Sequence, residues 1–363
     1  METKKVKFVL NADVLKSNVQ HFSEIGQVYY PLKTNSNPIV LEELIELFKD
    51  NNNGFLITHR SHFEKLIKLG VTPNRMGLVN VLASDEDIKY YYESGVRYFT
   101  FDSLDKLLTF FKYANASEVK ISVRLNIKEP FNIESHLGTT TSECKEMFDM
   151  LRDKRVPDYG VSFYLQKELF PQVNVLNEML DYIIRNFSSY NLDFINIGGA
   201  LKSQEIDRKK LDEAKEALGA KYIILEPGRY MVGNSGYMLN KIIRRKSDDC
   251  FVVQNGIYGG LVDTLLYHKQ YQMFLLCDKN LVRLSTVPFE GGKSFKLCGS
   301  SSDSGDRLGT FYIDEKYYSY LFEGNDIIIL DALSYVEEFF MSLGGDLEPD
   351  YHVVNCNSIE KRR

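Results

Sequence analysis

The sequence predicts an α/β protein: a (β/α)8 barrel followed by an all-β domain of sandwich or barrel type. Between about residues 27 and 230, short apolar runs alternate with amphipathic stretches, which implies parallel strands joined by right-handed crossovers. About eight such units in roughly 200 residues favour a barrel, although a doubly wound sheet fits the pattern nearly as well. After Gly236 the pattern changes to short β-like runs separated by Gly, Asn and Asp turns.

The expected barrel strands are short apolar runs that recur along the first two thirds of the chain. They are Gln27–Leu32, Gly54–Thr58, Arg75–Val79, Tyr98–Phe101, Val119–Leu125, Tyr159–Tyr164, Phe194–Ile197 and Tyr222–Leu225.

The expected helices lie between these strands. Their apolar residues recur at spacings of three and four, as Leu41, Leu44 and Phe48 do on one helix face. Asn37 followed by Pro38 is typical of an N-cap and first-turn pair. The expected helices are Pro38–Phe48, Ser61–Leu69, Ser84–Glu93, Leu104–Tyr113, Thr141–Asp153, Val173–Asn186 and Gln204–Leu218.

The second domain is expected to contain little helix. We place residues 25–232 in the barrel, and residues 1–24 and 233–363 in a β-rich domain with an N-terminal strand and a C-terminal tail. The tail from Asp346 to Arg363 ends in a polar, charged stretch that is expected to be frayed. The β-like runs are Tyr237–Ile243, Phe251–Gln254, Leu281–Thr286, Ser294–Cys298 and Asp326–Leu330.

The composition is typical of a soluble cytoplasmic protein. The chain has 363 residues, a formal net charge of −6 and 44% hydrophobic residues, enough to bury a large core. It has no basic stripe for nucleic acid, no apolar segment of a secretory signal and no run near the roughly 18 residues that span a membrane. Five scattered cysteines without a CxxC pair indicate free thiols in a reducing compartment: Cys144, Cys250, Cys277, Cys298 and Cys356.

Neither a metal site nor a dinucleotide site is expected. The six histidines form no HxxxH or HExxH pattern, so the sequence offers no helical pair of metal ligands. No GxGxxG motif follows an expected strand, which argues against a dinucleotide cofactor.

Lys33 lies in the segment YYPLKTNSNP, residues 29–38, at the carboxyl end of the first expected barrel strand. Side chains at that end reach the mouth of the barrel, where barrel active sites form. An apolar strand would desolvate the amine and lower its pKa, which suits Schiff-base chemistry. By position alone, a surface lysine at a strand end is the simpler interpretation.

Five further segments change that interpretation. Residues 196–200 read NIGGA, 226–230 read EPGRY, 255–259 read NGIYG, 299–306 read GSSSDSGD and 332–335 read ALSY. With the Lys33 segment, they resemble the motifs YAVKANxNP, DIGGG, EPGRY, DGxYG, GPxC[DE]SxD and GAY of the alanine-racemase-like, fold-type III pyridoxal 5'-phosphate (PLP) enzymes. Their order is similar to that of the ornithine/diaminopimelate/arginine decarboxylase branch, and the resemblance covers nearly the whole chain.

The resemblance implies a role for each matching residue in holding the cofactor. Lys33 is expected to form a Schiff base with PLP, and Glu226 to keep the pyridine nitrogen protonated so that the ring accepts electrons. Tyr164 stands where the family has a histidine stacked on the ring. The residues implied in phosphate binding are Gly198, Gly199, Gly228, Arg229 and Tyr335.

The resemblance also implies a homodimer with shared active sites. Ser302 and Asp303 are expected to enter the site from the partner subunit, with Asp303 and Tyr267 facing the far end of the substrate. A buried carboxylate requires a partner, so Asp303 suggests a cationic or hydrogen-bonding substrate end.

Four departures from the family pattern bear on activity. Tyr164 replaces the stacking histidine and carries no imidazole charge, while Leu56 replaces an acidic residue of the second strand. Ser302 replaces the cysteine that usually protonates the product carbon, and a hydroxyl is a far weaker acid. Tyr267 replaces the aspartate that binds the distal amine in ornithine decarboxylases.

The sequence therefore indicates a PLP-dependent L-amino-acid decarboxylase, acting on a diamino acid or on a larger biosynthetic intermediate that carries one. An amino-acid racemase or epimerase on the same scaffold is one alternative. A catalytically silent homologue that binds and regulates a partner is another, suggested by the departures and opposed by the intact Lys33 and Glu226.

Overall fold

The structure, a computed structural model, describes residues 4–165, 174–199, 201–340, 347–355 and 358–360. The chain forms two compact units. The first consists of Val19–Lys33 and Leu41–Tyr230, and the second of Met1–Asn18, Thr34–Val40 and Met231–Arg363. The second unit thus includes a short segment from within the predicted barrel range.

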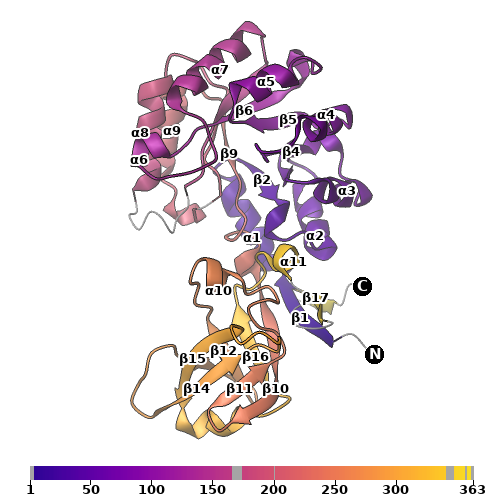
Figure 1. The fold of residues 1–363 in the computed structure, drawn as a ribbon, viewed down its shortest axis with the longest axis vertical. Helices are drawn as coiled ribbons and strands as arrows, with labels where there is room; N and C mark the ends of the chain where they lie inside the picture. Colours follow the sequence, from indigo (N-terminus) through magenta and orange to yellow (C-terminus); the bar gives the residue numbers. More distant parts are fainter. Residues whose placement is uncertain (1–3, 166–173, 200, 341–346, 356–357, 361–363) are drawn as a thin grey trace. The chain divides into compact units, whose positions relative to one another are not determined.

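The first unit is built on a closed barrel of eight parallel strands, as predicted, so the doubly wound alternative is wrong. The barrel closes where Val28 of the first strand pairs with Leu225 of the last. Figure 1 shows these strands inside the unit. They are β2 (Gln27–Pro31), β3 (Gly54–Ile57), β4 (Met76–Leu78), β5 (Tyr98–Phe101), β6 (Lys120–Arg124), β7 (Asp158–Ser162), β8 (Phe194–Asn196) and β9 (Tyr222–Leu225).

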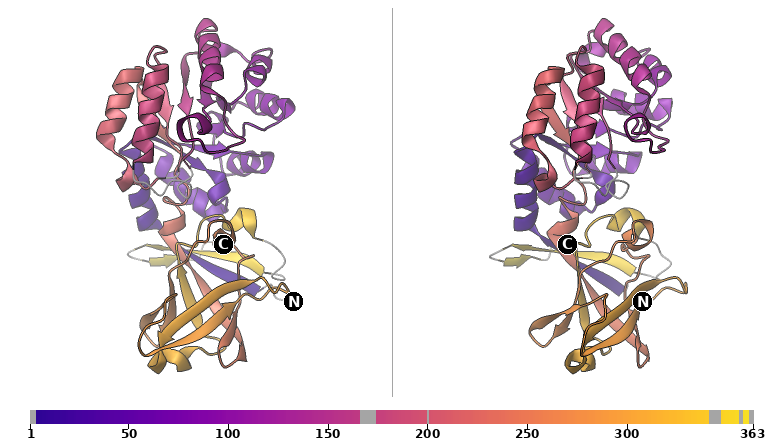
Figure 2. Two further views of the ribbon diagram at one scale, coloured as in Figure 1. Left: turned by 60° about the vertical axis from the view of Figure 1, so that its left-hand side comes forward. Right: turned by 90° about the vertical axis from the view of Figure 1, so that its left-hand side faces the viewer.

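Helices follow the strands and cover the outside of the barrel (Figure 1). Ser84, Ser103 and Thr140 each accept a hydrogen bond from an otherwise unpaired amide in the first turn of a helix. The last two helices pack side by side (Figure 2). The helices are α2 (Pro38–Phe48), α3 (Arg60–Lys68), α4 (Asp85–Glu93), α5 (Leu104–Phe110), α6 (Lys128–Phe131), α7 (Thr141–Asp153), α8 (Val175–Phe187) and α9 (Arg208–Leu218).

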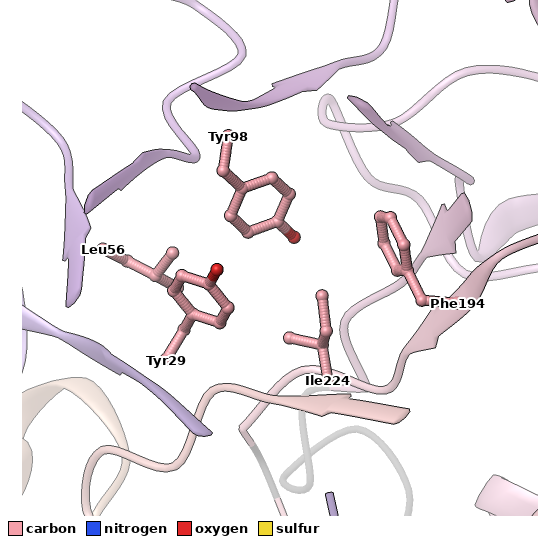
Figure 3. Close-up of a cluster of buried hydrophobic side chains, with 5 residues drawn as sticks. All are labelled: Tyr29, Leu56, Tyr98, Phe194 and Ile224. Atoms are coloured by element: carbon pink, nitrogen blue, oxygen red, sulfur yellow. The ribbon is translucent and has the colours of Figure 1, made fainter. Parts of the chain in front are cut away.

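Side chains from alternate strand positions fill the barrel interior. Tyr29, Leu56, Tyr98, Phe194 and Ile224 form a buried cluster across it (Figure 3). The rings of Tyr98 and Phe194 pack edge to face, with centroids 6.1 Å apart. On each strand, the residues two positions before and two positions after the cluster residue also face inward. The earlier one lies toward the amino end of the barrel and the later one toward the carboxyl end.

The second unit is built on a ten-stranded sheet, in agreement with the predicted β-rich domain. The N-terminal strand, β1 (Lys4–Asn11), pairs antiparallel with β10 (Gly236–Ser247) and parallel with β17 (Leu347–Asn355). Among the described residues, the short helices α10 (Asp263–Leu266) and α11 (Val336–Phe339) belong to this unit, and α1 (Ala12–Ser23) begins in it and ends in the first unit. The strands are β1 (Lys4–Asn11), β10 (Gly236–Ser247), β11 (Cys250–Val253), β12 (Met273–Cys277), β13 (Asn280–Leu284), β14 (Gly292–Cys298), β15 (Arg307–Asp314), β16 (Asp326–Leu330), β17 (Leu347–Asn355) and β18 (Ser358–Glu360).

Two expectations for this unit were incomplete or wrong. Strands β12 and β15 were not predicted, although β12 alternates buried and half-buried residues as a half-exposed strand does. The tail also contains an unpredicted strand, β17, whose backbone pairs with β1 and whose Tyr351 and Val353 are buried. The expected fraying of the polar end is wrong at Ser358–Glu360, where β18 pairs with β17.

Among the described residues, no helix is long and apolar enough to cross a membrane. In the same part of the chain, four cysteines take part in no disulfide: Cys144, Cys250, Cys277 and Cys298. Cys356 lies outside the described residues.

Candidate active site

Lys33 lies directly beyond β2, in the short turn Leu32–Thr34. Parallel strands end together at the barrel mouth, so Lys33 shares this end with Glu226, the residue after β9. The Lys33 side chain is accessible to solvent, but protein surrounds it on most sides. This restricted solvation lowers the pKa of Lys33, and the Glu226 carboxylate opposes the shift. A lowered pKa enlarges the neutral, nucleophilic fraction of the amine.

Glu226 is held in place by Asn196, a fully buried residue at the end of β8. Asn196 Nδ2 donates to Glu226 Oε1 over 2.7 Å and to the Tyr98 hydroxyl over 3.0 Å. Burial raises the pKa of Glu226, while the Asn196 bond and the positive charges of Lys33 and Arg124 oppose the shift. The carboxylate therefore has a fixed orientation among cationic neighbours.

Arg124, at the end of β6, belongs to the same cluster, although sequence reasoning did not single it out. Burial lowers the pKa of Arg124, and the negative charges of Glu226 and Asp102 oppose that shift. Lys120, Ser122 and Arg124 alternate along β6 and so share its inner face. Polar residues at every second position of an otherwise apolar barrel strand were the available signal.

The loop after β8 brings its backbone against the end of β9. Gly198 has φ of 70°, a conformation that glycine adopts without strain. A Cβ atom at Gly199 would lie 1.7 Å from the Glu226 carbonyl oxygen, so only glycine fits there. The Glu226 amide donates to the Gly198 carbonyl over 2.8 Å. Such a loop lets backbone amides approach an anion, although Ala200, the last residue of this motif, lies outside the described residues.

Gly228, Arg229 and Tyr164 lie at the same end of the barrel, beyond β9 and β7. After burial and the Arg124 charge, the Arg229 charge also lowers the pKa of Lys33, and the Tyr164 hydroxyl acts electrostatically on Arg124. The barrel unit therefore brings together seven predicted residues, whose individual roles stay predictions: Lys33, Tyr164, Gly198, Gly199, Glu226, Gly228 and Arg229.

The residues that follow Lys33 are bonded to the segment that contains Tyr335, and both segments belong to the second unit. The Tyr335 amide donates to the Thr34 carbonyl oxygen. Buried Asn35 donates to the Leu333 carbonyl over 2.8 Å and to the Tyr351 hydroxyl over 2.9 Å. The Tyr335 backbone thus lies beside the residue next to Lys33, a link that the motif strings alone did not reveal.

Ser302 and Asp303 lie on an exposed loop of the second unit, between β14 and β15. The Tyr258 hydroxyl and the Gly305 amide donate to the Asp303 carboxylate, and these bonds hold its pKa below the usual range. Tyr267 ends α10 in the same unit and is half-buried. The ionised Asp303 carboxylate and the Ser302 hydroxyl are thus exposed to solvent in the single chain.

Buried Asp306 shapes this loop from within. Its Oδ1 accepts from the Ile257 amide over 2.7 Å, and its Oδ2 accepts from the Ser301 amide over 3.2 Å. A Cβ atom at Gly256 or Gly299 would lie about 2 Å from this carboxylate. The aspartate and glycines of the two matching motifs therefore fit together sterically, and Asp306 is a structural residue.

The donor set at the barrel mouth fits PLP. An accessible lysine with a lowered pKa can attach an aldehyde, and an oriented carboxylate can pair with a protonated pyridine nitrogen. The glycine loop and Arg229 supply a phosphate site. Together with the fold, these groups define a barrel-type PLP enzyme.

Comparison with known proteins gives the family. The sequence profile of the pyridoxal-dependent decarboxylase family, pyridoxal binding domain, matches residues 13–233. The chain therefore belongs to the pyridoxal-dependent decarboxylases, enzymes that release carbon dioxide from amino acids with PLP as cofactor, as its motifs indicated.

Individual relatives are distant. Ornithine decarboxylase of Schizosaccharomyces pombe is 24% identical over 301 residues, which cover 77% of this chain and 67% of that one. Antizyme inhibitor 2 of Xenopus laevis is 23% identical over 281 residues, 68% of this chain and 60% of that one. The arginine decarboxylase of Paramecium bursaria Chlorella virus has a similar fold, with a TM-score of 0.78 and 17% identity over 97% of this chain and 96% of that one.

Proposed function

We propose that this protein decarboxylates an L-amino acid that carries a second, distal amino group, either a free diamino acid or a larger biosynthetic intermediate that contains one. The observation that carries the proposal is the charge arrangement at the barrel mouth, where accessible Lys33 and Asn196-bound Glu226 influence each other's pKa. The relatives named as ornithine and arginine decarboxylases support a basic substrate.

Each barrel residue has a distinct part in this proposal. PLP, when bound, supplies the electron sink that accepts the electron pair of the broken bond between Cα and the carboxylate. Lys33 Nζ would hold the cofactor through its aldehyde carbon. Glu226, oriented by Asn196, holds a proton at the pyridine nitrogen. The loop at Gly198 and Gly199 binds the phosphate.

The phosphate site is completed by Gly228, Arg229 and Tyr335, and Tyr164 covers one face of the ring. The position of Tyr335 beside Thr34 supports its part, because it ties the Tyr335 segment to the chain that follows Lys33.

The far end of the substrate is proposed to meet Tyr267 and, in a homodimer, Asp303 of the partner subunit. Asp303 is ionised and faces solvent in the single chain, so it can accept a cationic amine supplied by another molecule. Tyr267, in place of an aspartate, offers no carboxylate to a free distal amine, which suits a substrate whose distal amine is conjugated. We further propose a cytoplasmic location, in keeping with the scattered cysteines.

A screen for carbon dioxide release tests the proposal. Purified holoprotein is incubated with L-lysine, L-ornithine, L-arginine, meso-diaminopimelate and conjugates of the first two, with Lys33→Ala as the inactive control. We expect release from at least one substrate and a matching amine product. Exchange of the α-proton without carbon dioxide would indicate a racemase.

A regulatory homologue is the second candidate, favoured by the match to antizyme inhibitor 2 and by the replacements at Tyr164 and Ser302. The two candidates differ in turnover. A protein that binds PLP but releases no carbon dioxide and exchanges no α-proton with any substrate of the screen fits the regulatory role and contradicts the enzymatic one.

A further inference from the structure

A polar pocket lies at the amino end of the barrel, opposite the end that carries Lys33 and Glu226. All of its lining residues belong to the first unit. Its volume is about 670 Å³, within the usual range for small-molecule sites. Its lining includes the first residues of five barrel strands: Gln27, Gly54, Lys120, Asp158 and Tyr222. Nothing in the proposed decarboxylation uses this end of the barrel.

Lys120 lines this pocket at the beginning of β6. Its side chain is 16% exposed, and its amine lies over the faces of four aromatic rings. The distances from Nζ to the ring centroids are 5.4 Å for Tyr29, 5.3 Å for Tyr98, 5.6 Å for Phe194 and 4.9 Å for Tyr222. Figure 3 shows three of these rings, Tyr29, Tyr98 and Phe194, converging in the barrel interior. These four rings surround Lys120 Nζ and restrict its position.

The charge of Lys120 is only partly compensated within the described part of the chain. Asp158 Oδ2 lies 3.7 Å from Nζ and the Tyr29 hydroxyl 3.5 Å, both longer than a good hydrogen bond. The Asp158 carboxylate already accepts from the Tyr222 hydroxyl over 2.6 Å. Burial lowers the pKa of Lys120, while the charge of Asp158 and its hydrogen-bonding contact with the amine oppose the shift.

The rest of the lining adds positive charge and hydrogen-bond donors. Arg75 lines the pocket, with its guanidinium anchored to the Asn53 carbonyl over 2.6 Å. Lys49 lies at the rim, where it pairs with Glu46, so the net positive charge rests on Lys120 and Arg75 against Asp158. Among the side-chain amides of the lining, Gln27 and Asn53 already donate to the Asn52 carbonyl and the Ser23 hydroxyl, and Asn51 donates to the Leu47 carbonyl. Asn52 and Asn74 supply further donors.

We propose that this pocket binds a small oxyanion, a carboxylate or a phosphate ester, whose anionic group bonds to Lys120 Nζ and faces Arg75. The anion supplies the short hydrogen bonds that the amine lacks. The side-chain amides of Asn52 and Asn74 then donate to the polar remainder of the ligand.

Titration of the holoprotein with inorganic phosphate and with succinate, followed by calorimetry, tests this proposal. Bound PLP occupies the phosphate site at the barrel mouth, so binding reports another site. Lys120→Met keeps a side chain of similar length among the rings and removes the charge. The matched control is Lys221→Met, because Lys221 is exposed at the same barrel end, pairs with Asp193 and does not line the pocket.

We expect Lys120→Met to weaken binding by about tenfold or more, the loss of one charge-assisted hydrogen bond, and Lys221→Met to leave it unchanged. Binding of phosphate alone identifies a phosphate-ester site, and binding of succinate alone identifies a carboxylate site. Equal affinity in Lys120→Met and wild type, or no binding of either anion at millimolar concentration, overturns the proposal.

A second measurement uses only wild-type protein and does not depend on how the variant folds. Reductive methylation of Lys120 and Lys221 is followed by mass spectrometry with and without the anion. We expect the anion to slow methylation of Lys120 and to leave Lys221 unchanged. No protection, or equal protection of both, contradicts a site at Lys120.

Discussion

Two lysines lie at opposite ends of the same barrel, and restricted solvation lowers the pKa of each beside a carboxylate. Lys33 follows β2 on a turn, and the charges near it belong to Glu226 and two arginines. Lys120 begins β6 on the inner face of the barrel, and its amine lies among four aromatic rings.

Position relative to the strand end decides what each lysine can do. Beyond the strand, the Lys33 amine is accessible and can form a covalent bond. Inside the strand, the rings hold the Lys120 amine in one place, so it can attract an anion but cannot follow a reacting group. A lowered pKa alone does not distinguish a reactive lysine from a binding one.

The largest effect is expected for Lys33→Ala. No other described barrel strand is followed so closely by a lysine, so this variant should lose turnover by roughly a thousandfold or more and lose covalent PLP attachment. Borohydride reduction and peptide mapping locate the attachment. A trapped adduct on Lys120 or on any other lysine would contradict the assignment of Lys33 as the lysine that binds PLP covalently.

Glu226→Gln tests the carboxylate partner of the reactive lysine. The amide keeps an oxygen for the Asn196 bond but cannot hold the pyridine nitrogen protonated, so kcat should fall by roughly a hundredfold while PLP stays bound. Removing the negative charge also lowers the pKa of Lys33 further, because Glu226 raises it in the wild type. Steady-state kinetics of the holoprotein measures kcat, and the pH dependence of Schiff-base formation when PLP is added to the cofactor-free protein measures the pKa of the Lys33 amine. Wild-type kcat would refute the assignment.

Much of this comparison was readable from the sequence. The barrel was predictable because each strand and helix is a contiguous run with its own period, and the positions of Lys33 and Glu226 followed from the strand ends. The motif strings then named their chemistry. Strand β17 was missed because its pairing partner, β1, lies at the other end of the chain.

The remaining site residues depend on contacts between distant strands. Three residues contact their partners only after the barrel has closed or the second sheet has formed: Arg124, Asn35 and Lys120. No short segment of the sequence predicts those contacts. The alternation of Lys120, Ser122 and Arg124 was the one readable signal, since it places three polar groups inside a barrel.

Asp158→Asn tests the carboxylate partner of Lys120, the lysine whose amine lies among four aromatic rings. Because Lys120 loses its nearest negative charge, the free energy of unfolding should fall by about 1 to 2 kcal/mol. The Tyr222 hydroxyl can still donate to the amide oxygen, so the fold should persist. Urea unfolding monitored by circular dichroism measures the loss, with Lys221→Met as a surface control. No change in stability would mean that the rings alone compensate the charge.

Mixing two inactive variants tests whether the Lys33 site needs a residue from a second chain. The Lys120 pocket is lined by one chain alone. If Asp303 enters from the partner, Lys33→Ala and Asp303→Ala chains should form mixed dimers with one site that is intact. Random pairing restores about a quarter of wild-type activity at most, because half the dimers are mixed and half their sites are intact. No recovery, with dimers verified by ultracentrifugation, argues against a shared site.

The smallest effect is expected at Ser302, the neighbour of Asp303 on the exposed loop. A serine hydroxyl has a pKa far above neutrality, so it is a poor proton donor, and the returning proton should come from Lys33 or from water. Ser302→Ala should therefore change kcat by less than about threefold, while Ser302→Cys supplies a stronger acid and should raise the rate or sharpen the stereochemistry of protonation. Turnover in deuterium oxide, with the configuration of the labelled amine determined by NMR, measures both. A large loss in Ser302→Ala would show that the hydroxyl takes part directly, and the reactive lysine would then depend on its partner chain for proton transfer as well as for substrate binding.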